Sequence, residues 1–195
     1  MIVKEARSHH SKLVIDTLVE AFREDPVFNW ISSNPAYQEF FFKTMTPYFL
    51  NNGYATLHKS GNGAMLWSPP NKKPKPLLTL KNTTHLMKTS SLTNLARGIK
   101  VLLQLEFSHP KKPHYYLLAI GTNSEGRGKG FGTALIKDLL RRCDEESVPA
   151  YLENTNKNNL AFYQGHGFNV TKRIDLLSGP SIWLMMRQPI AQCAT

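Results

Sequence analysis

Residues 115–132 of this chain read YYLLAIGTNSEGRGKGFG and carry its strongest structural signal. The first six, Tyr115–Ile120, form an apolar run of strand length, which predicts a strand buried on both faces at the centre of a sheet. Four glycines follow within 126–132, and an amphipathic pattern over 131–143 predicts a helix. A glycine loop between a strand and a helix start lets backbone N–H groups approach an anion. The arrangement indicates a pyrophosphate cradle.

Two common nucleotide-binding fingerprints do not fit this loop. A dinucleotide motif needs Gly or Ala at its sixth position, but counting from the glycines at 126, 128 or 130 gives neither. A P-loop needs Ser or Thr after Gly-Lys, and Lys129 is followed by Gly130. What remains is a different phosphate-bearing ligand, or a glycine-rich turn that binds nothing.

The rest of the chain predicts a mixed α/β order with hairpins at both ends. The expected elements are a strand at 2–6, a helix over 13–22 stopped at Asp25-Pro26, a helix from 35 to 51 capped by Asn34, a hairpin of 54–58 and 63–67, two helices within 77–107, the strand 115–120, the helix 131–143, a strand at 150–153, a short helix at 158–164, and strands at 168–175 and 181–187. The better of the two helices within 77–107 has an apolar face predicted at Leu92, Leu95, Ile99, Leu102 and Leu103.

Length and composition favour one globular domain over residues 1–195. Hydrophobic residues make up 41% of the chain and charged residues 19%, the balance of a protein that folds without staples. The N-terminus has no apolar h-region, and no apolar stretch is long enough to span a bilayer, so we expect a cytoplasmic protein without a membrane partner. The two cysteines, Cys143 and Cys193, stand far apart and outside any Cys/His cluster, so no metal site is expected.

The chain is basic, with 24 Lys and Arg against 14 Asp and Glu and a formal charge of +10. This balance favours a polyanionic partner, which includes both nucleic acid and a phosphorylated cofactor. The densest basic cluster, Lys72-Lys73-Pro74-Lys75, has no interleaved aromatic residues and is interpreted as a solvated loop.

The glycine loop does match (Arg/Gln)-x-x-Gly-x-(Gly/Ala), through Arg127, Gly130 and Gly132. This is the pyrophosphate-binding motif of the GNAT acetyltransferases, and from about Pro113 to the C-terminus the chain resembles their puromycin N-acetyltransferase-like branch. The supporting residues are Tyr151-Leu152-Glu153, Thr155-Asn156, Asn159, Phe162-Tyr163, His166-Gly167-Phe168, Gly179-Pro180 and Trp183, with Ala21-Phe22, Asp25-Pro26-Val27-Phe28 and Trp30 near the N-terminus. Residues 34–106 match only in the order of elements.

The resemblance implies the GNAT fold, a mixed and mostly antiparallel sheet of six or seven strands, splayed in the middle, with helices on both faces. It places the helical segment of about 77–107 on the acceptor side and implies acetyl-CoA (coenzyme A) as cofactor. The implied contacts are Ile120, Gly121, Thr122, Arg127, Gly128, Lys129, Gly130, Phe131, Gly132, Thr133, Asn156 and Asn159. The family usually has proline at the position of Ser124, so the loop is expected to be more mobile here.

Two catalytic residues follow from the same resemblance. Tyr163 stands where the family holds a tyrosine that protonates the CoA sulfur, although it could instead be a core aromatic. Glu153 stands where the related branch has a glutamate that accepts the amine proton through water, although a surface or Asn-bonded glutamate is the alternative. The neighbouring Glu106, His109 and His114 could line the acceptor pocket or simply face solvent, and they receive no role.

The expected function is acetyl transfer from acetyl-CoA to a primary amine of a small-molecule acceptor, by direct attack in a ternary complex. A homodimer is compatible with this function, and nucleic acid is not expected as a partner. Two alternatives stay open. One is a basic nucleic-acid-binding or regulatory module that keeps a CoA-binding fold without catalysis, and the other is an enzyme that uses a longer acyl-CoA.

Overall fold

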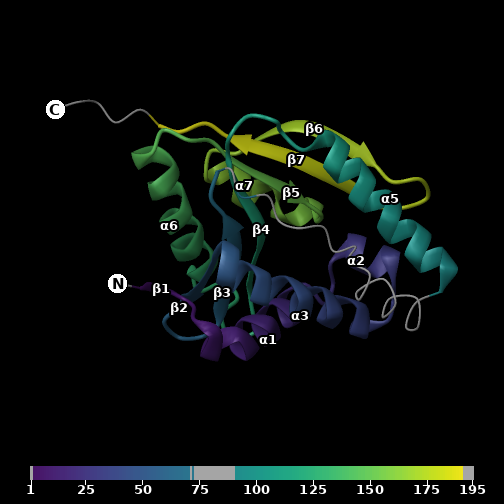
Figure 1. Ribbon diagram of the computed structural model, residues 1–195, viewed down its shortest axis with the longest axis horizontal. Helices are drawn as coiled ribbons and strands as arrows, with labels where there is room; N and C mark the ends of the chain where they lie inside the picture. The colour runs from purple at the N-terminus through teal and green to yellow at the C-terminus, as the bar shows by residue number, and fades with distance from the viewer. Residues whose placement is uncertain (1, 71, 73–90, 191–195) are drawn as a thin grey trace.

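The computed structural model describes residues 2–70, 72 and 91–190, which form a seven-stranded sheet with helices on both faces (Figure 1). Its strand order is β1-β2-β3-β4-β5-β7-β6. The strands are β1 (Val3–Glu5), β2 (Tyr54–His58), β3 (Gly63–Ser68), β4 (Tyr115–Thr122), β5 (Ala150–Asn154), β6 (Asn169–Asp175) and β7 (Ser181–Arg187). Neighbouring strands are antiparallel except β4 and β5. The mixed, mostly antiparallel sheet predicted from the sequence is therefore confirmed.

The helices lie where their apolar faces can cover this sheet. They are α1 (Ser11–Ala21), α2 (Pro26–Ile31), α3 (Pro35–Asn52), α5 (Leu92–Ser108), α6 (Phe131–Glu145) and α7 (Leu160–Gly165), with short 3-10 turns η1 (Ser8–His10) and η2 (Lys157–Asn159). Helices α1 and α3 pack on one face of β2–β4, and α6 packs on the other (Figure 1). Residues of α2 and α5 form a further apolar cluster with β5, β7 and Tyr116.

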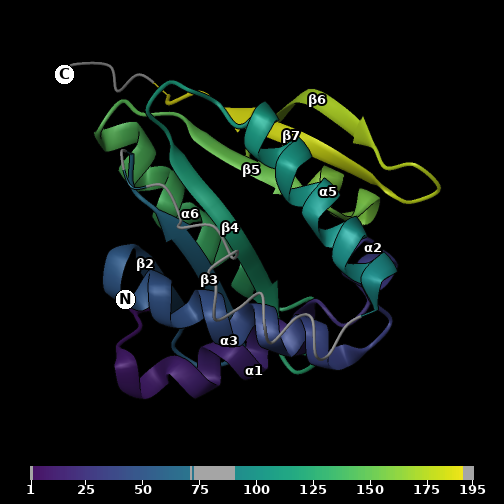
Figure 2. The ribbon, with the colours of Figure 1, turned by 45° about the vertical axis from the view of Figure 1, so that its right-hand side comes forward.

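Strands β4 and β5 pair over only three residues and then separate. Their parallel register runs from Tyr115 opposite Ala150 to Leu117 opposite Leu152, whereas β4 continues to Thr122 and β5, paired with β7 along its whole length, continues to Asn154 (Figure 2). The backbone edge of β4 beyond Leu117 is thus free of β5. The splay predicted for the middle of the sheet is present, and it opens a wedge.

The segment Asp25-Pro26 does more than end a helix, which is all that the sequence pattern predicted for it. Helix α1 has already ended at Ala21, and a separate helix, α2, begins at Pro26. The Asp25 carboxylate caps it by accepting hydrogen bonds from the backbone N–H of Val27 and Phe28, both at 3.0 Å. Proline suits the first helical position because its missing N–H would be unpaired there anyway. This short helix was missed in the sequence.

Helix α5 exists as predicted, but its predicted apolar face is wrong. Leu92 is 82% exposed and Leu103 is 50% exposed, whereas the buried positions are Gly98 and Val101. A methyl group on Gly98 would lie 3.3 Å from the Tyr37 hydroxyl, so a small residue sets how closely α5 approaches its neighbours. Periodicity located the helix without locating its buried side. The helix predicted before it falls within 73–90 and lies outside the described residues.

Candidate functional site

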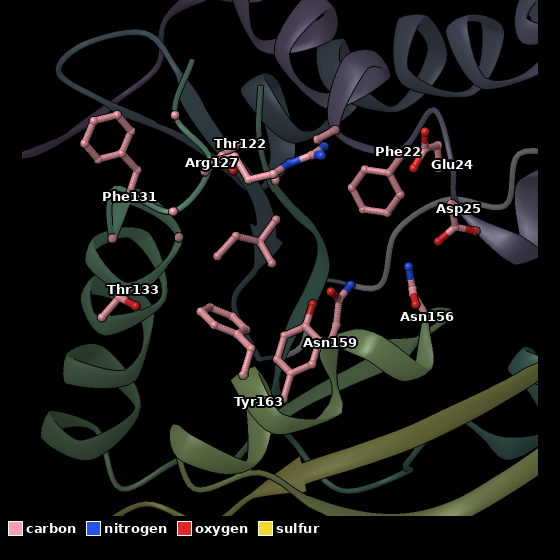
Figure 3. Close-up of a pocket in the computed structure, with 18 residues that line it drawn as sticks. Phe22, Glu24, Asp25, Thr122, Arg127, Phe131, Thr133, Asn156, Asn159 and Tyr163 are labelled. Carbon is pink, nitrogen blue, oxygen red and sulfur yellow. The ribbon is translucent and has the colours of Figure 1, made fainter. Parts of the chain in front are cut away.

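A cavity of about 600 Å³ occupies the wedge between β4, the glycine loop and α7 (Figure 3). It is lined by Ala21, Phe22, Glu24, Asp25, Ile120, Gly121, Thr122, Gly126, Arg127, Gly128, Gly130, Phe131, Gly132, Thr133, Asn156, Asn159, Phe162 and Tyr163. Every predicted cofactor-binding residue except Lys129 is in this lining, together with Tyr163. The structure therefore brings the glycine loop, the β4 edge and the proposed acid to one cavity.

Unpaired backbone N–H groups are the main polar feature of the loop end of this cavity. Gly128 and Gly130 have φ angles of +75° and +76°, a region that favours glycine, and Gly130 is the N-cap of α6. No described group accepts a hydrogen bond from the N–H of Gly128, Gly130 or residues 131–133. A methyl group at Gly128 or Gly130 would meet nothing within 4 Å, so these amides are open to a ligand. Such amides at a helix start suit a phosphate group.

The loop before this cradle is held by several hydrogen bonds. The Ser124 N–H donates to Glu20 Oε1 at 2.7 Å, and the Gly126 N–H donates to Asn123 Oδ1 at 3.0 Å. A methyl group on Gly126 would lie 2.3 Å from the backbone oxygen of Asn62, so only glycine fits there. Proline at 124 could not donate the first of these bonds. These bonds tie the loop to Glu20 and Asn123 where the family usually has proline, and the greater mobility expected for the loop stays a prediction.

The two basic side chains of the loop differ in where they lie. Arg127 lines the cavity and crosses it in Figure 3, whereas Lys129 is exposed and outside the lining. A role of either side chain in cofactor binding stays a prediction, and the position of Arg127 favours it over Lys129. Position 121 needs glycine for a steric reason, because a methyl group there would lie 2.4 Å from the Ala21 side chain. Because Gly121 has no side chain, α1 can approach β4 at the cavity wall.

Tyr163 points into the cavity from α7 and is 8% exposed (Figure 3). Burial, and secondarily the negative charge of Asp25, raise the pKa of Tyr163 well above its ordinary value. The phenol therefore keeps its proton at neutral pH and can donate it. Its ring also packs edge-on against Phe168, with centroids 6.0 Å apart. The role of a core aromatic and a position in the cavity coexist in this residue.

The cavity wall opposite the glycine loop contains residues that the sequence analysis did not assign to the site: Phe22, Glu24 and Asp25 (Figure 3). Besides capping α2, the buried Asp25 accepts a hydrogen bond from the Thr155 hydroxyl. Burial raises the pKa of Asp25 and outweighs these bonds, which lower it. The available signal was an acidic pair directly before Pro26. Only the fold brings it to face Tyr163.

The two asparagines of the lining differ, because only the side chain of Asn156 caps a helical turn. Asn156 is the N-cap of η2, where its Oδ1 accepts a hydrogen bond from the Asn158 N–H at 3.0 Å. Both asparagines line the cavity, and Figure 3 shows Asn159 beside Tyr163 and Asn156 on the side of Asp25. Capping uses one amide oxygen of Asn156, so its N–H₂ group remains for a ligand.

Glu153 does not line the cavity. It is the first β5 residue after the β4–β5 pairing ends, and its side chain is 7% exposed. The Tyr116 hydroxyl donates to its Oε2 at 2.6 Å, and His109 Nδ1 lies 3.4 Å from its Oε1. Neither alternative for this residue, a surface glutamate or one bonded to asparagine, is correct. The solvent-facing interpretation of His109 is also wrong, because its side chain is 13% exposed.

Three features of the described residues concern metal-binding clusters, membrane-spanning helices and free thiols. Within 2–70, 72 and 91–190, no three His, Cys, Asp or Glu side chains gather in a way that could hold a metal ion. In the same ranges, no helix is both long enough and apolar enough to cross a membrane. Cys143 is a free buried thiol, and burial raises its pKa to about 12.

Comparisons with known proteins agree with this fold. The family model of the Acetyltransferase (GNAT) family matches residues 96–168, which include the glycine loop and Tyr163. An uncharacterized N-acetyltransferase of Schizosaccharomyces pombe is 26% identical over 208 residues, spanning 97% of this chain and 84% of the relative.

Solved structures extend the likeness to nearly the whole chain. A protein described as histone acetyltransferase HPA2 and related acetyltransferase, from Corynebacterium glutamicum, has a TM-score of 0.74 at 23% identity, covering 98% of each chain. Arylalkylamine N-acetyltransferase 2 from Aedes aegypti has a TM-score of 0.66 at 13% identity, covering 95% of this chain and 97% of the other. At these identities, the likeness establishes the GNAT fold.

The family match, the yeast relative and the fold support the GNAT superfamily for this chain. It is an acetyl-CoA-dependent N-acetyltransferase. These comparisons do not separate the puromycin N-acetyltransferase-like branch from other branches.

Proposed function

We propose that the chain transfers an acetyl group from acetyl-CoA to the primary amine of a small molecule, with both substrates bound in the wedge. One observation carries this proposal: unpaired amides at the start of α6 and the protonated phenol of Tyr163 face the same cavity. The amides suit a diphosphate, and a β4 edge free of β5 suits the amide-containing pantetheine arm. These residues fit coenzyme A in charge and in hydrogen bonding.

The proposed reaction is direct attack of the neutral amine on the thioester carbonyl. The new N–C bond forms as the C–S bond breaks, and Tyr163 donates its proton to the departing sulfur. The nitrogen loses a proton through water to Glu153, which lies where β4 and β5 part. Backbone N–H groups of the β4 edge near Ile120 are suited to polarise the carbonyl. The negative charge moves from Glu153 to Tyr163, and the site is reset when Glu153 releases its proton and Tyr163 takes one up.

The acceptor is proposed to enter at the wall formed by Phe22, Glu24 and Asp25. An aromatic ring and two carboxyl groups favour an organic amine over an anion or a neutral sugar. The fold shared with a mosquito arylalkylamine N-acetyltransferase is consistent with such an acceptor.

The puromycin N-acetyltransferase-like branch is proposed as well, because segments that carry that resemblance meet in space. Trp30 Nε1 donates to the Ser178 backbone oxygen at 2.9 Å, and a methyl group on Gly179 would lie 2.6 Å from the Trp30 ring. The Trp30 ring therefore leaves no room for a side chain at position 179. Residues 148 positions apart in the chain thus form one packed unit beside α2.

The experiment is an acetyl-CoA assay that detects released thiol over a panel of amines, with Tyr163→Phe and Glu153→Gln beside the parent. We expect at least a tenfold loss of kcat in each variant, on the usual scale of acid–base catalysis, with acetyl-CoA affinity retained. Unchanged turnover in both variants would remove the assigned roles. Calorimetry that shows no binding of acetyl-CoA at millimolar concentration would remove the proposal altogether.

The other sequence-based expectations stay predictions. These are the cytoplasmic location, the single domain over 1–195 with an acceptor-side helical segment at about 77–107, the compatibility with a homodimer, the absence of a nucleic-acid partner, and the preference for acetyl-CoA over a longer acyl-CoA. A basic regulatory module without catalysis would bind acetyl-CoA and release no thiol with any amine, so the same assay separates it.

A further inference from the structure

A buried group of polar side chains connects Glu153 to the protein surface on the side away from the cofactor cavity. The group consists of Glu153, Tyr116, His109 and His114, and nothing in the proposed reaction uses its two histidines. Tyr116 and His114 are 8% and 9% exposed. Titratable groups that adjoin a proposed base are candidates for a role in proton transfer.

The contacts within this group form a continuous line. His109 Nδ1 lies 3.4 Å from Glu153 Oε1, and His109 Nε2 lies 3.0 Å from His114 Nε2. His114 Nδ1 lies 2.7 Å from the Lys112 backbone oxygen. The line therefore runs from the carboxylate through two imidazole rings to a backbone carbonyl.

Counting protons along this line shows that it can accept one. A carbonyl only accepts, so His114 Nδ1 carries a proton, and each of the two remaining contacts also needs one. Two neutral imidazoles bring two protons, whereas the three contacts need three. The fully bonded line therefore holds one proton more than neutral rings beside an ionised Glu153. That extra proton can reside on Glu153, His109 or His114.

The far end of the line opens to solvent. Tyr116, His109 and His114 line a surface hollow of about 80 Å³, and the rest of its wall comes from Ser68, Pro69, Lys72, Pro110, Lys111, Lys112 and Pro113. The Ser68 hydroxyl is buried and has no partner among the described residues, so a water in the hollow would satisfy it.

Tyr116 holds Glu153, which is the end of the line nearest the wedge. Its hydroxyl donates to Glu153 Oε2, and burial together with the Glu153 charge raises the pKa of Tyr116 well above its ordinary value. The phenol therefore stays protonated and holds one carboxylate oxygen, which leaves the other for His109. The titratable or charged groups that face the line are Glu106, Tyr116, Tyr151, Lys72, Lys111 and Lys112.

We propose that Glu153, His109 and His114 form a proton path that carries the proton released by the acceptor amine to the surface hollow. This inference rests on the proposed function, in which Glu153 receives that proton. The proton passes from Glu153 Oε1 to His109 Nδ1, and His109 gives up its Nε2 proton toward His114 and water in the hollow. One proton enters, one leaves, and exchange with water restores the starting tautomer. His109 and His114 are positioning and relay residues, because they act through Glu153.

The test compares the parent with Glu153→Gln, His109→Ala and His109→Gln, with His9→Gln as the control. His9 lies in η1 on the exposed surface and outside the site. We expect both His109 variants to lose roughly tenfold in kcat, at the low end of acid–base effects, with the affinity for acetyl-CoA unchanged. Added imidazole should restore most of the activity of His109→Ala and should not change the parent. The control should match the parent.

Two outcomes overturn the path while leaving the proposed function intact. One is a His109→Gln enzyme as active as the parent. Glutamine can fill the space and form hydrogen bonds, but its amide cannot take up a proton and pass it on. The other is a His109→Ala loss that imidazole does not relieve. If Glu153→Gln keeps full activity, the path falls together with the role of Glu153 as the base, whereas the proposed acetyl transfer stands.

A measurement that needs no turnover tests the line directly. In imidazole nitrogen NMR spectra, we expect the His109 Nδ1 signal to move in Glu153→Gln relative to the parent, because an amide replaces the carboxylate that lies 3.4 Å from that nitrogen. We also expect His114 to hold its proton on Nδ1. Identical His109 nitrogen signals in the two proteins would overturn the path even if no amine in the panel reacts.

Discussion

The two sides of the wedge between β4 and β5 are built in different ways. On the cofactor side, the polar groups are mainly backbone N–H groups at the start of α6, where glycines alternate with residues that carry side chains. On the Glu153 side, the polar groups are side chains from β4, β5 and the connection before β4, all largely buried. One side depends on where Cβ atoms are missing, and the other on where particular heteroatoms are present.

This difference teaches which changes each side should tolerate. A backbone site survives most side-chain changes that leave the chain path intact, but an added Cβ at a close approach displaces it. A side-chain cluster survives small backbone shifts, but the loss of one donor leaves a buried partner unsatisfied. Substitutions on the two sides should therefore separate cofactor binding from turnover.

The largest expected effect is that of Gly126→Ala on the cofactor side. Its added methyl group would lie 2.3 Å from the Asn62 backbone oxygen, so the loop must move. We expect acetyl-CoA to bind roughly tenfold to 100-fold more weakly, the equivalent of about 1.4–2.8 kcal/mol. Calorimetry measures this against Gly165→Ala, where a methyl group meets nothing within 4 Å. Equal affinities in the two variants would break the link between loop geometry and binding.

The next effect is that of Tyr116→Phe on the Glu153 side. It removes the donor to Glu153 Oε2 and leaves a buried carboxylate oxygen without its partner. Because such a loss costs about 1–3 kcal/mol, we expect roughly a tenfold fall in kcat with an unchanged dissociation constant for acetyl-CoA. Steady-state kinetics and calorimetry on the same sample check both halves. A matching loss of acetyl-CoA affinity would mean that the two sides are not independent.

A smaller effect is expected for Arg127→Gln. Arg127 lines the cavity and Lys129 does not, although both are exposed cations of one loop. A charge contact near the surface is worth about 1 kcal/mol, so we expect about fivefold weaker acetyl-CoA binding, with less difference at high salt. The matched control Lys129→Gln should bind like the parent. Equal losses in both variants would point to the net charge of the loop instead of one contact.

The smallest effect concerns stability at the acceptor wall. Burial raises the pKa of Asp25, so the folded protein holds a proton that the unfolded chain loses near its ordinary value of 3.8. The free energy of unfolding therefore falls as the pH rises from 3.8 through the raised pKa, and the deficit is complete above it.

Asparagine caps a helix as well as aspartate and carries no charge. We expect Asp25→Asn to melt about 2–4 °C above the parent at neutral pH. Below about pH 3.5, we expect the two proteins to have the same melting temperature. Thermal melts across pH measure this. A lower melting temperature at every pH would show that the hydrogen bonds of the carboxylate outweigh its burial.

Much of the fold was readable because its signals are local. The buried strand 115–120, the amphipathic helix at 131–143 and the Asn34 cap each depend on residues within one element, and the structure confirms them. The predictions were wrong or incomplete where contacts with a distant part of the chain determine the structure. The buried side of α5 follows from the close approach at Gly98, and α2 follows from a cap on Asp25 that also serves a distant threonine.

The sequence by itself determined the cofactor side of this protein. Small residues at fixed spacing after a strand suffice to predict bare amides, because the amides and the glycines that expose them are neighbours in the chain. Only the tertiary structure decided the other side: that Asp25 faces Tyr163 across the cavity, and that Glu153 is held by Tyr116 and His109 from outside β5. Burial and pairing of a carboxylate are properties of what packs around it, and no local pattern encodes them.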